Sequence, residues 1–530
     1  MELWIHVDFK YMPPTVESLI NDIENWAAEG ATGVVFEWEN MFPYPGLGSA
    51  VRADAYTPGD VRLILDACRA VGLAAVPLVQ TLGHLEWLLE HEEFRRFREF
   101  DEDPRQIKAC DGEARAILTR KIAALLEAHY DSEYVHLGAD EAYGLEKIDR
   151  SGCSSVAEGA GTVFLRHIAP LLEQVEAAGK RPIIWADMPL HHPENIAEYP
   201  QNVVFCDWLY SQTSDHASSL HDWELGRVEA DRYALVPEYR RGLFEPYWSI
   251  GAREFPGEFY QFPYTPYLRD SGYDVVVGPS TLYAGNALSA QDLPNARANA
   301  RGWLGAARRF GAIGALNTCW AIRGAFREVT NAGHRAFLRL GTQTEDAQDD
   351  ATLSAACWRG IAGDDAPAVA KLIDGLAPPV DELSSTRPIV FDAARRTHRP
   401  RAYDERWESL RETLAALDPG DPDVEQHEAA ADRGRRTAET LAAFGSEHEQ
   451  LRAWELAARE TALRAEVWLA AWRKARTRPH RESLDRLATE IDAQAGLIER
   501  FMTGRYMASD RELVLEDRYG SLSRLLKLMA

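Results

Sequence analysis

Two neighbouring carboxylates, Asp140 and Glu141, follow the apolar run in the stretch YVHLGADEAY, residues 134–143. The run is typical of a buried strand, where carboxylates are costly unless their charge has a use or a partner. Glycoside cleavage needs one acid that protonates the leaving oxygen and one ionised carboxylate that stabilises developing positive charge. We therefore predict that Asp140 and Glu141 are the catalytic pair.

Strand alternation refines this prediction. His136, Gly138 and Asp140 share one face of an extended chain, and Gly138 keeps that face thin where other groups must approach closely. Glu141 has the opposite parity, which means that in an extended strand its side chain would point to the other face. It can join Asp140 only if the strand has already ended and the following loop turns it inward.

Further polar and aromatic side chains stand at the ends of other predicted strands. Indole faces suit the C–H faces of a sugar ring, although packing in the core or on the rim is the default for any single tryptophan. The strand-end candidates for substrate binding are Asp8, Glu37, His84, Trp185, Asp187, Asp207, Trp208, Tyr283 and Trp320.

Eight short apolar or β-branched runs recur through about residue 340, and helix-like patterns separate most of them. The runs span residues 3–9, 33–39, 73–80, 134–140, 182–187, 203–208, 273–280 and 313–320. Alternation of apolar strands with helices predicts a parallel sheet covered by helices, and eight such units predict an α/β fold of the (β/α)₈ TIM-barrel type. Catalytic groups in such a barrel lie at the carboxyl ends of its strands.

The 530 residues are predicted to form two domains. Residues 1–345 form the catalytic barrel, with an aromatic, proline-rich insertion at about 209–272 that walls a pocket or packs on the rim. Residues 346–530 lack strand signals and carry apolar stripes at helical spacing, as in 407–417 and 484–501. This part is predicted to be an all-α domain and a candidate homodimer interface.

Charge and composition exclude several classes of partner. The net charge of −25 and the absence of a long Lys/Arg run argue against nucleic acid and against anionic membranes. The start of the chain lacks signal-peptide character and the six cysteines are scattered, so we expect a cytoplasmic protein. The histidines have no metal-motif spacing, and we predict neither a metal site nor a cofactor.

At residues 136–141, HLGADE resembles the H-x-G-[GAC]-D-E signature of glycoside hydrolase family 20, the β-N-acetylhexosaminidases. VQTLGHLEW (79–87) and FEWENMFPYPG (36–46) resemble the hexosaminidase D branch more narrowly. The resemblance covers roughly residues 1–340 and does not extend to the helical part.

The resemblance implies a substrate-assisted mechanism, in which the 2-acetamido oxygen of the sugar attacks its own anomeric carbon. Asp140 would then orient the acetamido group, and Glu141 would act as acid and base. The matching positions imply substrate contacts from His84, His136, Trp185, Trp208, Asp187, Asp207, Tyr283 and Trp320. Lys10 stands where many members carry an Arg that binds sugar hydroxyls.

The residues leave two alternatives open. A related barrel glycosidase could use two protein carboxylates, with Glu37 or Asp187 as nucleophile, on another or modified sugar. A non-catalytic sugar-binding or scaffold protein could keep the barrel and use the helical part to recruit partners. The predicted ligand is a carbohydrate with a terminal N-acetylhexosamine, and its gluco or galacto configuration stays open.

Overall fold

The computed structural model describes residues 1–283, 290–321, 324–342, 349–376, 389–392, 397–400, 407–444, 448–476 and 481–530. All eight predicted strands form, and they join in one parallel sheet that closes where β1 pairs with β17. The barrel strands are β1 Glu2–Asp8, β2 Gly33–Glu37, β3 Ala74–Leu78, β6 Tyr134–His136, β9 Arg181–Trp185, β10 Val204–Trp208, β15 Asp274–Gly278 and β17 Gly314–Cys319. The TIM-barrel prediction is confirmed.

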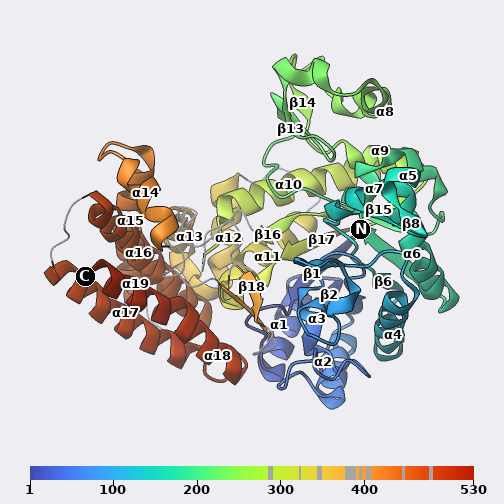
Figure 1. Cartoon of the computed structure of the whole chain (residues 1–530). Coiled ribbons are helices and arrows are strands. Elements are labelled where there is room, and N and C mark those ends of the chain that lie inside the picture. Colours follow the sequence, from blue (N-terminus) through green and yellow to red (C-terminus); the bar gives the residue numbers. More distant parts are fainter. Residues whose placement is uncertain are drawn as a thin grey trace.

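Helices connect successive strands and cover the outside of the barrel (Figure 1). They are α1 Val16–Ala28, α2 Pro58–Ala70, α4 Gly112–Ala128, α6 Ala160–Ala177, α7 Asp187–His191, α9 Tyr264–Asp270, α10 Leu293–Phe310 and α11 Arg327–Thr342. Local sequence fixes their starts: Thr57 and Asp60 form a capping box at α2, and Asp111 caps α4.

The barrel interior is a separate apolar cluster, to which the strands contribute alternate residues. Trp4 of β1, Val35 of β2 and Cys206 of β10 belong to it, whereas their chain neighbours face the surrounding helices. At the next inward level Asp8 pairs in register with Glu37. Strand parity therefore decides which polar side chains can meet at the carboxyl end of the barrel.

The loops at the carboxyl end carry additional small elements. They include η1 Glu39–Met41, α3 Glu86–Leu89, the hairpin of β4 Arg98–Phe100 with β5 Asp103–Ile107, η3 Tyr143–Lys147, β7 Asp149–Arg150, β8 Cys153–Ser154 and α5 Ser155–Glu158. The short connection between β9 and β10 holds α7 and η4 Pro193–Glu198. These loops surround the strand ends that hold the candidate residues.

The predicted aromatic insertion folds into short strands and helices. Its elements before α9 are β11 His216–Ala217, β12 Ser219–Asp222, β13 Gly226–Glu229, η5 Ala230–Leu235, α8 Glu238–Trp248 and β14 Phe259–Tyr260. Figure 1 shows α8, β13 and β14 projecting from the barrel. Helix α9 instead packs on β10 and β15, so the last part of this segment serves as a barrel helix.

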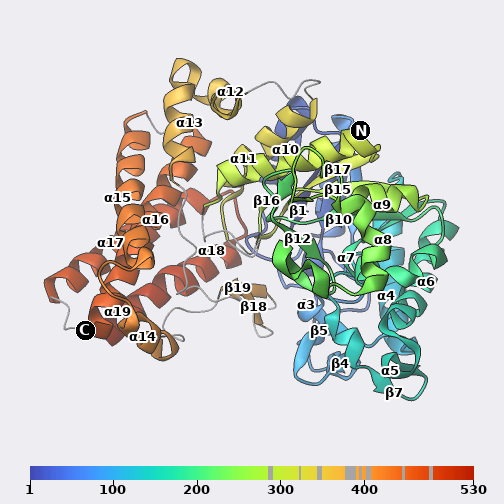
Figure 2. The same cartoon turned by 90° about the horizontal axis from the view of Figure 1, so that it is seen from above.

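The C-terminal part is mainly helical and lies to one side of the barrel (Figures 1 and 2). Its helices are α12 Asp350–Ala362, η7 Gly363–Asp365, α13 Ala366–Asp374, α14 Trp407–Ala416, α15 Pro422–Ala443, α16 Glu449–Arg476, α17 Arg481–Met502, α18 Ala508–Val514, η9 Leu515–Gly520 and α19 Ser521–Met529. A hairpin of β18 Ile389–Asp392 and β19 Thr397–Pro400 was not predicted. The predicted boundary at residues 345 and 346 lies outside the described residues.

Barrel loops pack into the core of this C-terminal part. Tyr11 and Met12, from the loop after β1, and Phe326, from the loop after β17, belong to its apolar cluster. Arg52 of the barrel binds Asp510 at 2.6 Å, and both side chains are buried. The helical part therefore supports the carboxyl end of the barrel next to Lys10.

No helix in the described part of the chain combines the length and the apolar character that a membrane crossing requires.

Candidate functional site

Asp140 and Glu141 lie on a sharply turned loop. β6 ends at His136, and positive φ angles follow at Gly138 (61°), Ala139 (70°) and Glu141 (51°). A Cβ atom on Gly138 would come within 2.1 Å of Gln80 Oε1, so only glycine fits beside this side chain. The strand thus ends early, as the parity argument required, and the turn brings Glu141 beside Asp140.

His84 contacts both carboxylates. Its Nε2 atom lies 3.2 Å from Asp140 Oδ2 and 3.4 Å from Glu141 Oε2. Burial lowers the pKa of His84, but the charge of Asp140 and hydrogen bonds to both carboxylates outweigh burial and raise this pKa well above its usual value. The contacts with Asp140 and Glu141 therefore favour the charged form of His84, which bridges the predicted catalytic pair.

The two carboxylates differ in their environment. The Asp140 side chain is 7% exposed and the Glu141 side chain 45% exposed. Burial raises the pKa of Glu141, but the hydrogen bond and charge of His84 and the charge of Arg105 lower it below its usual value. Without bound sugar Glu141 is ionised, although the mechanism predicted from the sequence requires a protonated acid.

Asp187 holds this loop from the neighbouring strand. Its Oδ2 atom accepts the backbone N–H of Glu141 at 2.8 Å, and the side chain is fully buried. Burial, followed by the charges of Asp140 and Glu141, raises the pKa of Asp187 well above its usual value. The structure therefore joins Asp140, Glu141, His84 and Asp187 in one group.

A second polar group surrounds Lys10. Its Nζ atom donates to Glu37 Oε1, lies 3.0 Å from Glu39 Oε1 and lies 3.5 Å from Asp8 Oδ1. His6 Nε2 lies 3.1 Å from Glu37 Oε2, and Ala321 N donates to Asp8 Oδ2 at 3.0 Å. The cation thus holds three buried carboxylates together.

Burial and charge act differently on these carboxylates. Burial raises the pKa of Glu37, but Lys10 and His6 outweigh it and hold this pKa well below its usual value. Burial raises the pKa of Glu39 well above its usual value despite Lys10, and that of Asp8 rises for the same reason. Carboxylates that share one cation cannot all ionise equally easily.

Gln80 connects the two polar groups. Its Nε2 atom donates to Glu37 Oε1 at 3.0 Å, and its side chain lies against Gly138. Glu39 and Gln80 stand at strand ends in the sequence, beside the candidates Glu37 and His84. His6 was not among the candidate residues, and its inward position in β1, two residues before Asp8, was the available signal.

Aromatic side chains form a third group beside the carboxylates. The Trp185 ring lies 6.0 Å from Trp320 and 6.5 Å from Trp208, measured between centroids. Tyr210 lies 4.8 Å from Trp208, 5.5 Å from Tyr283 and 6.5 Å from Trp320. The structure therefore brings the predicted aromatic residues together, and Tyr210 joins them as a residue that the sequence analysis missed.

His136 lies beneath this group. Its ring centroid lies 4.4 Å from that of Trp185 with the two planes tilted by 51°, and its Nδ1 atom accepts the N–H of Gly138 at 3.0 Å. Burial lowers the pKa of His136 to about 3, so the imidazole is neutral. His136 thus supports the turn that carries Asp140.

Asp207 does not join the other candidates. Cys206 lies in the barrel interior, so Asp207 faces outward, where its Oδ2 atom accepts the hydroxyl of Thr265 in α9 at 2.7 Å. Burial raises the pKa of Asp207 to about 7, although bonds from Thr265 oppose this rise. The expectation that Asp207 contacts the sugar is corrected: its parity directs it to the helix layer.

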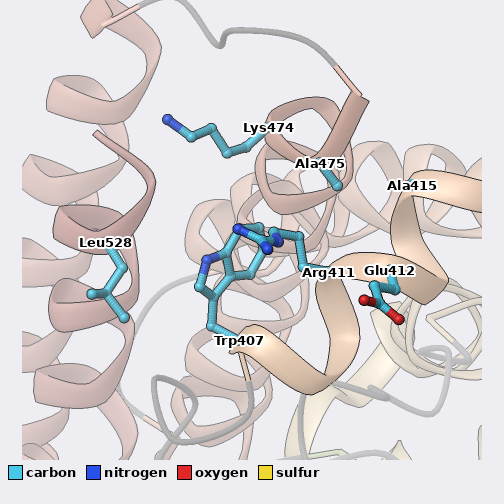
Figure 3. A pocket seen from close by; sticks show the side chains of 7 residues that line it. All are labelled: Trp407, Arg411, Glu412, Ala415, Lys474, Ala475 and Leu528. Atoms are coloured by element: carbon cyan, nitrogen blue, oxygen red, sulfur yellow. The ribbon is translucent and has the colours of Figure 1, made fainter.

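The C-terminal part holds a pocket of about 400 Å³ (Figure 3). Side chains from α14, α16 and α19 surround it, and they are Trp407, Arg411, Glu412, Ala415, Lys474, Ala475 and Leu528. Its one lining carboxylate, Glu412, cannot provide both the acid and the ionised partner that glycoside cleavage uses. The carboxyl end of the barrel is the better candidate for chemistry.

No family model matches the chain. Among solved structures, a Flavobacterium johnsoniae chitobiase has a TM-score of 0.48 and 12% identity, and the match covers 99% of this chain and 78% of that chain. A likeness of this level is too low to assign a function.

Curated proteins provide closer relatives. Hexosaminidase D of Homo sapiens is 31% identical over 256 residues, which make up 47% of this chain and 50% of the human protein. Hexosaminidase D of Bos taurus is 30% identical over 256 residues, which make up 70% of the bovine protein. The chain therefore spans half the length of the human relative and more than two thirds of the bovine one. On this similarity, the chain belongs to the hexosaminidase D branch of the glycoside hydrolase family 20 β-N-acetylhexosaminidases.

Proposed function

We propose that the protein is an exo-acting, retaining β-N-acetylhexosaminidase that removes terminal N-acetylglucosamine or N-acetylgalactosamine with the help of the substrate's own acetamido group. The observation that carries the proposal is the adjacency of Asp140 and Glu141, which a single atom, His84 Nε2, contacts at 3.2 and 3.4 Å. Two groups so close can serve neighbouring atoms of one sugar. Similarity to proteins named Hexosaminidase D supports the same reaction class.

In the first step, the acetamido oxygen forms a bond to the anomeric carbon while the bond to the leaving oxygen breaks. Glu141 gives its proton to that oxygen, and Asp140 accepts the acetamido N–H and stabilises the positive charge of the oxazolinium ring. In the second step, Glu141 takes a proton from water as the water oxygen bonds to the anomeric carbon, and the bond between that carbon and the acetamido oxygen breaks, which restores the acetamido group. Two inversions give net retention.

Glu141 must be protonated before the first step, whereas His84 keeps it ionised in the free protein. Its side chain is 45% exposed, so a bound sugar would remove it from water and raise its pKa. The acetamido N–H can also replace His84 as the partner of Asp140. Substrate binding would thus prepare the acid that the reaction uses.

The remaining groups would hold the sugar. The rings of Trp185, Trp208 and Trp320 offer apolar faces, and Tyr210 and Tyr283 extend that wall. Asp8, Lys10 and Glu37 would form a polar wall that faces the hydroxyl groups of the sugar. Within the described part of the chain, Glu39 Oε2 is buried without a hydrogen-bond partner, so a sugar hydroxyl that reaches this wall would be a partner for it.

A two-carboxylate mechanism through Glu37 is less well supported. Both oxygens of Glu37 are engaged, Oε1 with Lys10 and Gln80 and Oε2 with His6, and its side chain is 1% exposed. A nucleophile needs an oxygen free to approach the anomeric carbon. Glu37 would have to give up one of these contacts to act as nucleophile, whereas the roles proposed for Asp140 and Glu141 require no such change.

The first test compares initial rates on 4-nitrophenyl N-acetyl-β-glucosaminide, its galacto epimer and the plain β-glucoside. The proposal expects turnover of at least one N-acetyl substrate and none of the glucoside. Similar rates on the glucoside would exclude acetamido assistance. Binding of N-acetylglucosamine without any turnover would favour a sugar-binding protein.

The second test separates the role of Glu141. Glu141→Gln should lower kcat/KM by roughly 10²–10⁴-fold on a disaccharide, whose leaving group needs a proton, and much less on a dinitrophenyl glycoside. Glu127→Gln, at an exposed position of α4, is the matched control and should leave both rates unchanged. Equal losses on both substrates would contradict the role of Glu141 as the acid.

A further inference from the structure

A separate cluster of metal-binding groups lies beside the loop that carries Glu141. Glu146, His191 and His192 each offer one ligand atom, and these atoms lie within 4.8 Å of one another. Glu146 belongs to η3, which follows the Glu141 loop, whereas His191 ends α7, which begins at Asp187. Two imidazoles and one carboxylate are a donor set that suits zinc and similar divalent ions.

The hydrogen bonds of His191 prepare it as a ligand. Its Nδ1 atom lies 2.8 Å from the carbonyl oxygen of Trp223, and because a carbonyl only accepts, Nδ1 carries the proton. The other ring nitrogen, Nε2, faces Glu146 Oε1 at 2.9 Å. A cation shared between these two atoms, either a proton or a metal ion, satisfies both of them.

The spacing of this pair also fits a shared metal ion. Two ligand atoms about 2.1 Å from one ion and about 90–110° apart are separated by about 3.0–3.4 Å. The observed 2.9 Å between His191 Nε2 and Glu146 Oε1 needs little adjustment. The Glu146 side chain is 53% exposed, so it can move to close the distance to His192 and leaves room for a water ligand.

His192 adds a second, independent feature. Its side chain is 13% exposed, and its Nε2 atom is buried with no hydrogen-bond partner among the described residues. Its Nδ1 atom lies 3.6 Å from Glu194 Oε1. A ring nitrogen near a carboxylate and a free nitrogen on the other side are the usual arrangement of a histidine that binds metal.

A nearby cation does not prevent binding. Arg240 Nη1 donates to the backbone oxygen of His191 at 3.2 Å, but Asp222 at 2.7 Å and Glu224 at 3.1 Å neutralise the guanidinium. The local charge from Arg240 and its two partners is therefore negative overall. Glu146 and Glu194 increase the negative charge around the two histidines.

We propose that Glu146, His191 and His192 bind one divalent transition-metal ion, with Zn²⁺ as the expected occupant, and that this ion ties the Glu141 loop to α7. The carbonyl of Trp223 and the carboxylate of Glu194 orient the two imidazoles. The ion braces the segments that position Glu141 and Asp187 and takes no part in the bond-breaking steps. This inference stands independently of the proposed function, since metal binding is measured without substrate.

The test titrates Zn²⁺ into untagged, EDTA-dialysed full-length protein by calorimetry and repeats the titration with Co²⁺ by absorption spectroscopy. Wild type should bind one ion per chain, and the ion should raise Tm. His192→Gln and Glu146→Gln should lose this binding, whereas Glu194→Gln should weaken it by about 10-fold. His448→Ala, which removes an exposed imidazole far along the sequence, should bind as wild type does.

Circular dichroism and Tm of the metal-free variants show whether each variant folds. Loss of binding in a folded His192→Gln protein supports the site. Absence of stoichiometric binding in wild type would overturn it. Retention of full affinity by both folded ligand variants would also overturn it and would indicate adventitious surface binding only.

Discussion

The backbone N–H of Glu141 donates a 2.8 Å hydrogen bond to the Asp187 side chain, which joins the ends of two adjacent barrel strands. Glu141 adopts a φ of 51°, a conformation that costs energy for a residue with a side chain. The buried acceptor therefore helps to hold a strained turn. Asp187 is a positioning residue for Glu141 in this arrangement.

Substitutions of Asp187 test this role. Burial and the charges of Asp140 and Glu141 raise the pKa of Asp187 well above its usual value, which favours the neutral carboxyl that an amide resembles. Asp187→Asn should keep kcat within a few-fold, because its carbonyl can still accept the N–H of Glu141. Asp187→Leu should lower kcat by about 10²-fold, because it removes the acceptor.

Measuring kcat and KM separately on the N-acetyl substrates distinguishes a misplaced Glu141 from impaired sugar binding. Loss of the turn should affect kcat more than KM, since the sugar-binding aromatics stay in place. A kcat for Asp187→Asn as low as that for Asp187→Leu would show that the negative charge, and not the hydrogen bond, is required.

His84→Gln should move the alkaline limb of the kcat/KM pH profile to higher pH. The charge and hydrogen bond of His84 lower the pKa of Glu141, and glutamine removes the charge. The pKa of Glu141 then rises, and the protonated acid persists to higher pH. His448→Gln is the control, and an unshifted limb in His84→Gln would contradict the electrostatic link.

Lys10→Met should destabilise the protein by about 3–5 kcal/mol near neutral pH, because it leaves three buried carboxylates without their shared cation. Lys10 lowers the pKa of Glu37, so its contribution is present above the unfolded pKa and is lost as pH falls through the folded pKa. Urea unfolding should show the difference from wild type shrinking in acid. Exposed Lys527→Met is the control, and a pH-independent difference would argue against the charge explanation.

Asp207→Asn should leave activity unchanged and stabilise the protein above pH 7. Burial raises the pKa of Asp207 from 3.8 to about 7, so ionisation destabilises the folded state increasingly between these values. The stabilisation is at most about 4 kcal/mol and should vanish near pH 4. Urea midpoints at both pH values test it, and a loss of kcat/KM would return Asp207 to the substrate site.

The barrel could be predicted because its strands are apolar, evenly distributed and separated by helical patterns. The turn at Glu141 could also be predicted from the sequence, because Glu141 can lie beside Asp140 only if the strand ends before it. The same reasoning would have excluded Asp207, because Val204, Cys206 and Trp208 share the inward parity. Strand-end position alone was too permissive a criterion.

Other features depend on contacts between distant segments. The raised pKa of His84 follows from its distance to two carboxylates, and no local pattern gives that distance. Tyr210 stands two residues beyond Trp208 on the same parity, but only the folded chain places its ring between Trp208 and Tyr283. The short hairpin at β18 had too few residues to stand out beside long helices.

The packing of Tyr11 and Met12 into the core of the helical part has a consequence for how the protein unfolds. These residues directly follow Lys10, so opening that core would release the segment that neutralises Glu37. The barrel and the helical part should melt as one cooperative unit in calorimetry. A replacement of the helical part would therefore have to include a matching change in the loop after β1, since Tyr11 and Met12 of that loop complete its core.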